Sequence, residues 1–198
     1  NQITNLSPEY HKVPFNDTTI RDFYGGETQK QAGIEDLRLK QVLAHHDGSV
    51  TLLMEQTKEV FRTNMPGRNA YLPGAQSIDY YVENIIVGTV TKQFEADWQR
   101  VLHKKQYSYD DEAAYSSYFI HENPSAIRLL YNDEIRRSNT ISEYIVSATG
   151  NVQRRVLFNT DYSDLNLLIR NSTQVGSAST IIPSIKKNKL RLVELNYE

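Results

Sequence analysis

The 198-residue chain contains no cysteine. Disulfides, thiolate metal sites and cysteine nucleophiles are therefore excluded. The chain also lacks an excess of either charge, because 22 basic and 24 acidic residues leave a net charge of −2. The basic footprint that binds nucleic acid is thus absent. Apolar runs such as Ile85-Ile86-Val87 are only a few residues long, so no segment is expected to cross a membrane.

The sequence begins at Asn1, without an initiator methionine or the apolar stretch of a signal peptide. We interpret it as a mature or trimmed product from which any targeting segment has been removed. Aromatic residues are abundant, with 13 tyrosines, 6 phenylalanines and 1 tryptophan. Such side chains pack well on the pleated surface of a sheet, so this composition favours strands.

Two regions differ in their periodicity. Residues 1–34 are polar and rich in turn residues, including Pro8, Pro14 and the pair Gly25-Gly26. We expect an irregular arm there, with room for one short strand. Residues 35–198 are expected to form a domain of repeated β-units.

Turn signals divide the second region into hairpins. Asp47-Gly48 is a strong hairpin signal, because both central positions of such a turn favour positive φ. Thr149-Gly150-Asn151 marks a similar turn later in the chain. Between the first two hairpins, Asn64–Ser77 is predicted to be a long loop. The expected strands cover 37–43, 50–60, 80–91, 94–102, 115–120, 127–131, 141–148, 152–158, 165–169, 180–185 and 189–195.

The order of hairpin, polar connection and hairpin occurs twice, and half a copy precedes it. The return strands Gln99-Arg100-Val101-Leu102 and Arg154-Arg155-Val156-Leu157 match in this scheme. Four antiparallel strands per unit are typical of propeller blades. The sequence therefore predicts an all-β fold of about two and a half propeller-like units. These are too few to close a ring, so a fragment of a longer propeller is favoured over pairing with another copy or a compact stack.

Several of these segments resemble one family. The resemblance rests on Tyr80–Val87, on Lys104-Lys105-Gln106 before Ser116-Ser117-Tyr118, and on Leu130-Tyr131-Asn132-Asp133. In this order they resemble the C-terminal part of propeller-like envelope proteins of Bacteroidetes bacteria, over about residues 35 to 198. The turn after Val90 departs from the pattern, because Lys92-Gln93 stands where Asp-Gly is usual.

The resemblance implies a strand arrangement and a location, and it brings no activity with it. A member of such a family would be periplasmic or on the outer surface of a bacterium. It would act as a binding or scaffolding module of the cell envelope, in contact with protein or glycan. Apart from the resemblance, the incomplete number of units predicts open strand edges, which would allow a homo-oligomer or pairing with the rest of a longer chain.

Aromatic residues are the first candidates for a binding site. Tyr107, Tyr109 and Tyr118, with Trp98 nearby in the chain, could make a surface that stacks on sugars or contacts a protein. The competing interpretation is that these rings fill the core between sheets. It is favoured at about three to one, because aromatic residues in β-proteins are mostly part of the core.

Acidic residues offer a candidate cation site. Asp110 and Asp111, with Glu112, could join Asp133 and Glu134 around calcium, which binds several oxygen ligands. The spacing of a known calcium loop is absent, so a solvated acidic loop is the favoured interpretation and no other cofactor is expected. The pair His45-His46 before Asp47 is interpreted as the shoulder of a turn, because adjacent strand residues point to opposite faces.

No catalytic motif occurs in the sequence, so a non-enzymatic role is favoured. The alternative is a hydrolase acting on glycans with carboxylates of Asp110, Asp111 or Asp133 at the mouth of a blade. Two of these would then lie about 5–10 Å apart in a concave, aromatic-lined pocket.

Overall fold

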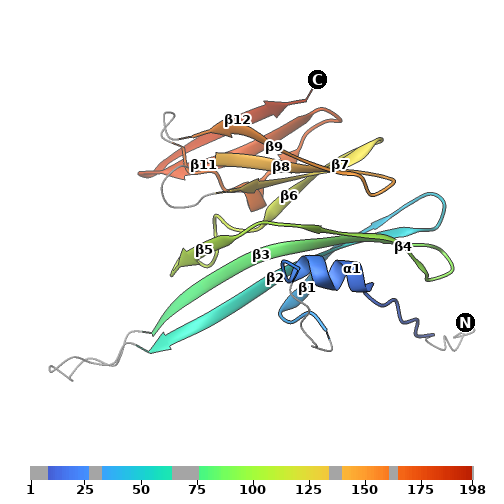
Figure 1. Ribbon diagram of the computed structural model, residues 1–198. Coiled ribbons are helices and arrows are strands. Elements are labelled where there is room, and N and C mark those ends of the chain that lie inside the picture. Colours follow the sequence, from blue (N-terminus) through green and yellow to red (C-terminus); the bar gives the residue numbers. More distant parts are fainter. Residues whose placement is uncertain (1–8, 27–32, 64–75, 134–139, 161–164, 198) are drawn as a thin grey trace, which may run out of the picture.

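A computed structural model describes residues 9–26, 33–63, 76–133, 140–160 and 165–197. The prediction of an all-β fold built from antiparallel strands is confirmed, and the strands form three sheets (Figure 1). The expectation of uniform four-stranded units is met in the second sheet alone. The first sheet has five strands, and the third has three.

Sheet A contains the first five strands in the order β1-β2-β3-β4, with β5 also paired to β3. The Asp47-Gly48 turn connects its first two strands where it was predicted, but only Gly48 has a positive φ, of +85°, and not both residues of the pair. Asp47 Oδ1 accepts hydrogen bonds from the backbone N–H and the hydroxyl of Ser49, which fix the turn. The strands are β1 (Leu37–Ala44), β2 (Val50–Thr63), β3 (Gln76–Val90), β4 (Ala96–Leu102) and β5 (Gln106–Tyr109).

Sheet B is a four-stranded meander in the order β6-β7-β8-β9. The side chain of Asn123 closes its first turn by accepting hydrogen bonds from the N–H groups of Ser125 and Ala126. Gly150, with a φ of +75°, lies in the turn between the last two strands of the sheet. The strands are β6 (Tyr118–Asn123), β7 (Ala126–Asn132), β8 (Thr140–Ser147) and β9 (Val152–Asn159).

Sheet C follows in the order β10-β11-β12. Its hairpin turn, Lys187-Asn188, has positive φ at both residues. The predicted strand 165–169 is not a strand in the structure. Leu167 makes an isolated bridge to Ser184, and the 3-10 helix η2 (Ile169–Asn171) follows it. The strands are β10 (Thr173–Gln174), β11 (Ser179–Lys186) and β12 (Lys189–Asn196).

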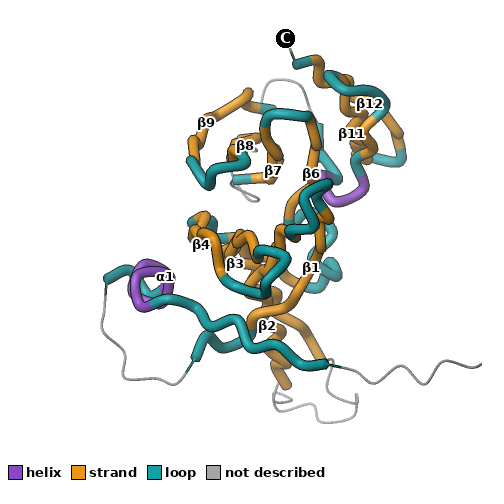
Figure 2. The backbone as a smooth tube through the Cα atoms, turned by 90° about the vertical axis from the view of Figure 1, so that its right-hand side faces the viewer, coloured by secondary structure: helices purple, strands orange, loops and turns teal. Residues whose placement is uncertain are grey.

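The three sheets stack with sheet B in the middle (Figure 2). Strand β7 contributes to both layers of the core, because its side chains alternate between the two faces of the sheet. Leu129 packs with Leu53 and Ile85 of sheet A. Leu130, the next residue, packs with Ile182 of sheet C and Ile169. All six side chains are completely buried.

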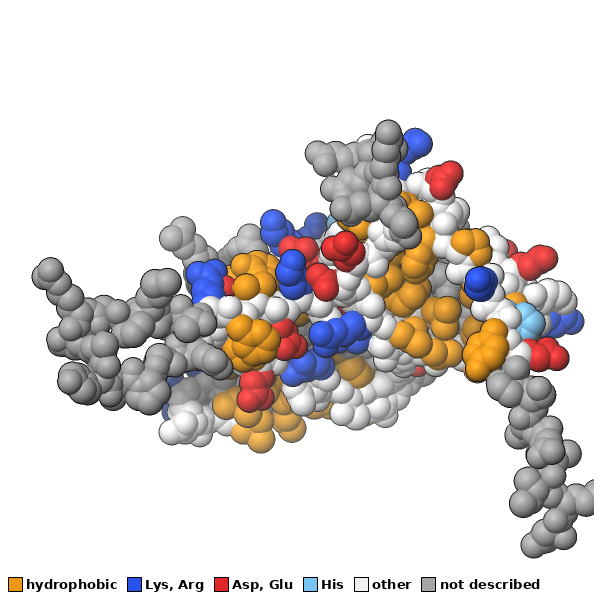
Figure 3. Space-filling model, turned by 90° about the horizontal axis from the view of Figure 1, so that it is seen from below, with side chains coloured by type: hydrophobic (Ala, Val, Ile, Leu, Met, Phe, Trp, Pro, Cys, Tyr) orange, Lys and Arg blue, Asp and Glu red, His pale blue; other side chains and the backbone are white. Residues whose placement is uncertain are grey.

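The outer face of sheet A is covered in part by the N-terminal segment. The expected irregular arm contains a helix, α1 (Asp17–Phe23), whose N-cap Asn16 accepts a hydrogen bond from Thr19 N–H. The arm is tied to β4 by Gln99, which accepts a hydrogen bond from Asn16 N–H and donates one to the carbonyl of Pro14. Figure 3 shows this side of the molecule, where basic and acidic side chains intermix around a group of hydrophobic ones.

Strand β5 and the start of β3 lie in segments that the sequence predicted to be connections. The polar connection predicted after Leu102 contains strand β5, whose pairing with β3 puts Tyr107 opposite Tyr81. The predicted loop Asn64–Ser77 lies mostly outside the described residues. Its last two positions, Gln76 and Ser77, belong to β3.

Buried tyrosines give the fold a dependence on alkaline pH. Burial raises the pKa of Tyr118, Tyr131, Tyr144 and Tyr197 above the ordinary value of 10.0. Above pH 10 the folded chain therefore keeps tyrosine protons that the unfolded chain releases. The stabilisation that comes from these buried tyrosines is complete below pH 10 and is lost progressively as the pH rises above it. Tyr118 alone is expected to remove about 1.4 kcal/mol of the free energy of unfolding per pH unit above pH 10.

Ultraviolet titration of tyrosinate, followed together with circular dichroism, checks this expectation. Part of the tyrosine signal should appear only as the chain unfolds, and Tyr118→Phe should remove part of that late signal. A titration in which all 13 tyrosines ionise near pH 10 while the strands persist would contradict it.

Candidate functional site

A cleft of about 670 Å³ opens where the hairpin turns of sheets A and B meet. Turns 45–49 and 91–95 of sheet A lie at the same end of the molecule as turns 124–125 and 148–151 of sheet B (Figure 1). All four turns or their flanking residues line the cleft. Its volume lies within the range of small-molecule sites, which is about 300–1,000 Å³.

Trp98 of β4 lines this cleft, and its ring is held in place from two sides. The indole Nε1–H donates a hydrogen bond of 3.1 Å to the carbonyl oxygen of Ala148. The ring lies against Gly150, where a Cβ atom would be only 2.6 Å from Trp98 Cδ2. Position 150 therefore requires glycine both for its positive φ and for this close approach. Trp98 thereby connects sheet A to the β8–β9 turn of sheet B.

The polar groups on the sheet A side form a chain of hydrogen bonds. His45 Nε2 and Thr51 Oγ1 are 2.7 Å apart, and Thr51 Oγ1 and Thr89 Oγ1 are 2.8 Å apart. Both threonines are buried. His45 thus has a fixed ring orientation, although the sequence predicted only a polar residue beside the hairpin turn. The hydrogen bonds from Ser49 lower the pKa of Asp47 nearby.

Many of the other lining residues are polar, and some are charged. The lining includes the ammonium group of Lys92 and the carboxylates of Asp47, Asp97 and Glu122. Hydroxyl and amide groups also line the cleft. Apolar residues contribute a substantial further part of the lining: Leu43, Ala44, Pro124, Ala126, Ile127, Val146 and Ala148. The cleft therefore combines one aromatic ring with many groups that can donate or accept hydrogen bonds.

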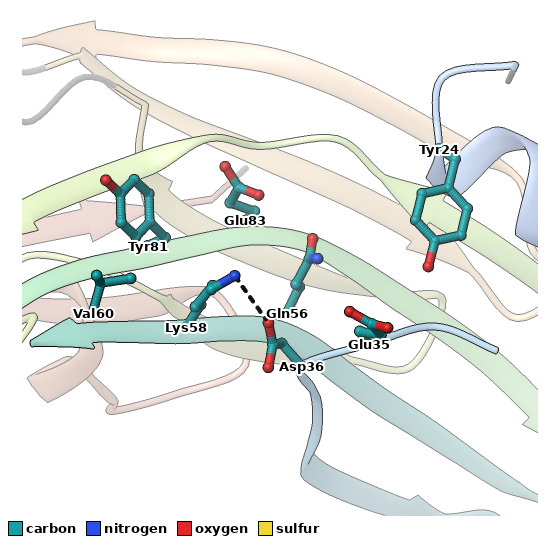
Figure 4. Close-up of a pocket in the computed structure, with 8 residues that line it drawn as sticks. All are labelled: Tyr24, Glu35, Asp36, Gln56, Lys58, Val60, Tyr81 and Glu83. Carbon is teal, nitrogen blue, oxygen red and sulfur yellow. Dashed lines mark ion pairs between the residues drawn. The ribbon is translucent and has the colours of Figure 1, made fainter. Parts of the chain in front are cut away.

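A second hollow, of about 550 Å³, lies on the outer face of sheet A (Figure 4). Strands β2 and β3 form its floor, and Tyr24 from the end of α1 lies at one side. It holds three carboxylates, Glu35, Asp36 and Glu83, and one ammonium group, that of Lys58, 4.0 Å from Asp36. Its acids show no arrangement for a metal ion, because the described residues contain no group of three or more suitable ligands.

The four aromatic residues predicted to form a binding surface are not brought together. Tyr118 is buried in the core between sheets A and B, as the competing interpretation held. Tyr107 lies on β5, where its hydroxyl donates a hydrogen bond of 2.7 Å to Asp79. Tyr109, at the end of the same strand, is 46% exposed. Only Trp98 lies in the cleft.

The acidic residues predicted to bind calcium each make a different contact in the structure. Asp110 accepts a hydrogen bond from Ile78 N–H, and Asp111 accepts one from Ala113 N–H. Asp133 pairs with Arg154 and accepts a hydrogen bond from Ser142. None of the three lines either hollow. The described part of the chain has no set of acids spaced for calcium.

A buried polar network, which sequence analysis did not predict, connects sheets A and B. The carboxylate of Glu55 lies 2.9 Å from Lys104 Nζ and accepts a hydrogen bond of 2.7 Å from Ser117 Oγ. Lys104 also donates to Gln106 Oε1 at 2.8 Å. Burial lowers the pKa of Lys104, while the carboxylate of Glu55 acts in the opposite direction. Because Glu55 and Lys104 are completely buried, this network supports the fold and is closed to a ligand.

The network extends to sheet B and to the segment before sheet C. Gln106 Nε2–H donates to the carbonyl of Asn132 at 2.7 Å. Asn132 Nδ2–H in turn donates to the carbonyls of Tyr115 and Leu167. The Lys-x-Gln, Ser-Ser-Tyr and Asn-Asp segments, which carried a resemblance in the sequence, therefore meet at one place.

Sheets B and C are joined by a second polar group. Glu143 is completely buried and pairs with Arg128 and Arg155. The guanidinium of Arg128 lies over the ring of Tyr197, 4.5 Å from its centroid. His121, also buried, is 2.7 Å from Thr180 Oγ1 of sheet C. These groups connect sheets B and C inside the fold, so the cleft between sheets A and B is the candidate binding site.

No protein-family model, curated protein or solved structure matches the chain. Among the described residues, no helix has the length and apolar character needed to span a membrane.

Proposed function

We propose that the protein is a non-enzymatic binding module that takes an uncharged glycan in the cleft between the turn ends of sheets A and B. The observation that carries the proposal is the position of Trp98. The chain's single tryptophan lies in a cleft of ligand size whose lining is otherwise rich in hydrogen-bonding groups.

The chemistry of the cleft fits a sugar better than an apolar ligand. The face of an indole packs on the C–H face of a pyranose, while hydroxyls, amides and carboxylates bind its hydroxyl groups. The three carboxylates of Asp47, Asp97 and Glu122 outnumber the one ammonium group of Lys92, so the cleft does not favour an anionic ligand. The fixed orientations of Trp98 and His45 reduce the entropy lost when the ligand binds.

The assignment to the bacterial cell envelope is part of the same proposal. It is supported by the resemblance of the sequence to propeller-like envelope proteins. The sequential order of the strands in sheets B and C and of the first four strands in sheet A is compatible with propeller-like units, and so is the stacking of sheet B between A and C (Figure 2). A binding role at the ends of the strands would suit such an architecture, because turns carry binding residues on a rigid scaffold.

The fluorescence of Trp98 provides a direct test. A glycan array would first identify oligosaccharides that bind the purified chain, and those hits would then be titrated while the tryptophan emission is recorded. We expect a saturable change in emission and protection from a soluble quencher, because no other tryptophan contributes to the signal. Binding should be equal with calcium and with chelator.

Matched variants locate the site. Trp98→Leu, whose affinity is measured by calorimetry because the variant has no tryptophan, is expected to weaken binding by about 1–3 kcal/mol, the magnitude typical of a lost stacking contact. Tyr109→Leu, at an exposed aromatic residue outside the cleft, should leave affinity unchanged. No hit on the array, or hits whose affinity Trp98→Leu does not alter in a folded variant, would contradict the proposal.

A further inference from the structure

The buried network between sheets A and B brings an amine next to a carboxamide. Lys104 lies two residues before Gln106, the first residue of β5, and both side chains are buried. Lys104 Nζ donates a hydrogen bond of 2.8 Å to Gln106 Oε1. The carboxamide carbon Cδ is therefore no more than about 4 Å from Nζ, because a C=O bond is about 1.2 Å long. This separation is close to the roughly 3–3.5 Å at which a nucleophile is positioned for attack.

The carboxamide of Gln106 is held as an acyl-transfer site holds its substrate. Its Oε1 accepts a hydrogen bond of 2.7 Å from the backbone N–H of Ser117, in addition to the one from Lys104. Such donors stabilise the negative charge that develops on a carbonyl oxygen when a nucleophile attacks its carbon. The amide nitrogen Nε2 is also fixed, because it donates a hydrogen bond of 2.7 Å to the carbonyl of Asn132.

A carboxylate lies within reach of the amine. Glu55 Oε1 is 2.9 Å from Lys104 Nζ and, in the described part of the chain, it is a buried oxygen that accepts no hydrogen bond. It can therefore take a proton from Nζ. The other oxygen of the carboxylate is held by Ser117 Oγ–H at 2.7 Å. Burial lowers the pKa of Lys104, which favours the neutral amine, the form that acts as a nucleophile.

We propose that Lys104 and Gln106 become joined by an amide bond inside the folded chain, in a reaction assisted by Glu55. Lys104 passes one proton to Glu55, and the neutral Nζ attacks Cδ of Gln106 to form a tetrahedral intermediate whose oxyanion faces Ser117 N–H. Glu55 passes that proton on to Nε2 and takes a second one from Nζ. The bond from Cδ to Nε2 then breaks, and Nε2 leaves as ammonia. One ammonium, one carboxamide and one carboxylate thus become one amide, one ammonia and one carboxylic acid.

The reaction replaces a buried ion pair by neutral groups. The pair of Lys104 and Glu55 is the state in which the chain folds, and the amide bond follows. A neutral amide and a neutral acid need no compensating charge in the core. Because the bond joins residues two positions apart, it closes a short loop and constrains the unfolded chain little. None of these residues lines the cleft that contains Trp98, so the inference is independent of glycan binding.

The intact mass of the purified, folded chain tests the inference. We expect a mass about 17 Da below the value calculated from the sequence, because one molecule of ammonia leaves when the amide bond forms. Trypsin should then fail to cleave after Lys104. Fragmentation of the product that covers residues 101–128 should place the bond between Lys104 and Gln106. A folded chain with the full calculated mass would overturn the inference, and so would a loss of ammonia located elsewhere.

Variants of the three reacting groups identify their roles. Gln106→Met removes the electrophile, Lys104→Met removes the nucleophile and Glu55→Gln removes the base, so each of these chains should keep its full calculated mass. Lys105→Met is the matched control, because Lys105 is exposed and its replacement should leave the loss of ammonia unchanged. Circular dichroism shows which variants fold, and the mass and peptides of the unmodified chain decide the question without them. A loss of ammonia that persists in Gln106→Met would contradict the proposed bond.

Discussion

Replacing Lys104 with methionine is expected to lower the free energy of unfolding by about 3–5 kcal/mol, because it leaves the carboxylate of Glu55 buried without its closest cation. The two charged groups are 2.9 Å apart, and neither side chain is exposed. Lys40 also pairs with Glu55, at 3.5 Å, but its side chain is 35% exposed, so it compensates the buried carboxylate only in part. The hydrogen bonds from Lys104 to Gln106 and to the carbonyl of Val82 are lost as well.

Urea-induced unfolding measures this loss. The double variant Glu55→Leu/Lys104→Met should recover most of the stability, because removing both partners leaves no uncompensated charge. Lys58→Met is the matched control, since Lys58 makes a longer and exposed ion pair, 4.0 Å from Asp36, and should unfold like the unmodified chain. If Lys104→Met unfolded at the unmodified chain's urea midpoint, the network would have no part in holding sheets A and B together.

Leu129→Ala and Leu130→Ala are each expected to lower the free energy of unfolding by about 2–5 kcal/mol. The two leucines are adjacent on β7 and completely buried, but they lie in different layers of the core. Because sheet B is shared by both layers, we expect each variant to destabilise the whole chain in a single transition.

Thermal unfolding recorded with two probes checks this expectation. Trp98 fluorescence reports on the layer between sheets A and B, and far-ultraviolet circular dichroism reports on all strands. The two midpoints should shift together in both variants. Val156→Ala, at an exposed position, should shift neither by more than the equivalent of about 0.5 kcal/mol. Separate transitions in Leu130→Ala would show that sheet C unfolds independently of the other two.

The sequence predicted strands where local turn chemistry is strong. The Asp47-Gly48 turn and the turn around Gly150 lie where they were expected, because a positive φ restricts the residues that fit. Helix α1 was missed, since its seven residues are too few for a periodic pattern, although Asn16 before Asp17 is a helix-start signal. The segment 165–169 has strand-like residues but is held by η2 and a single bridge.

Less of the candidate site than of the fold could be predicted from the sequence. The tyrosines at 107 and 109 are close to Trp98 in the chain, but β5 pairs with the far part of β3, whereas Trp98 faces Thr89 near the turns. Distance along the sequence therefore grouped residues that the fold separates. Likewise, Glu55 has no local signal that it meets Lys104. The contact between Glu55 and Lys104 depends on a register shift between Glu55 and Thr57 and on the docking of sheets A and B.

The order of the strands has a consequence for how the chain folds. Each sheet is built mainly from consecutive hairpins, whose contacts are close in sequence and can form within microseconds. The polar network instead joins positions as distant as Glu55, Ser117 and Leu167, so it forms only after long loops have closed. Docking of preformed sheets, rather than formation of the strands, should therefore limit the rate of folding.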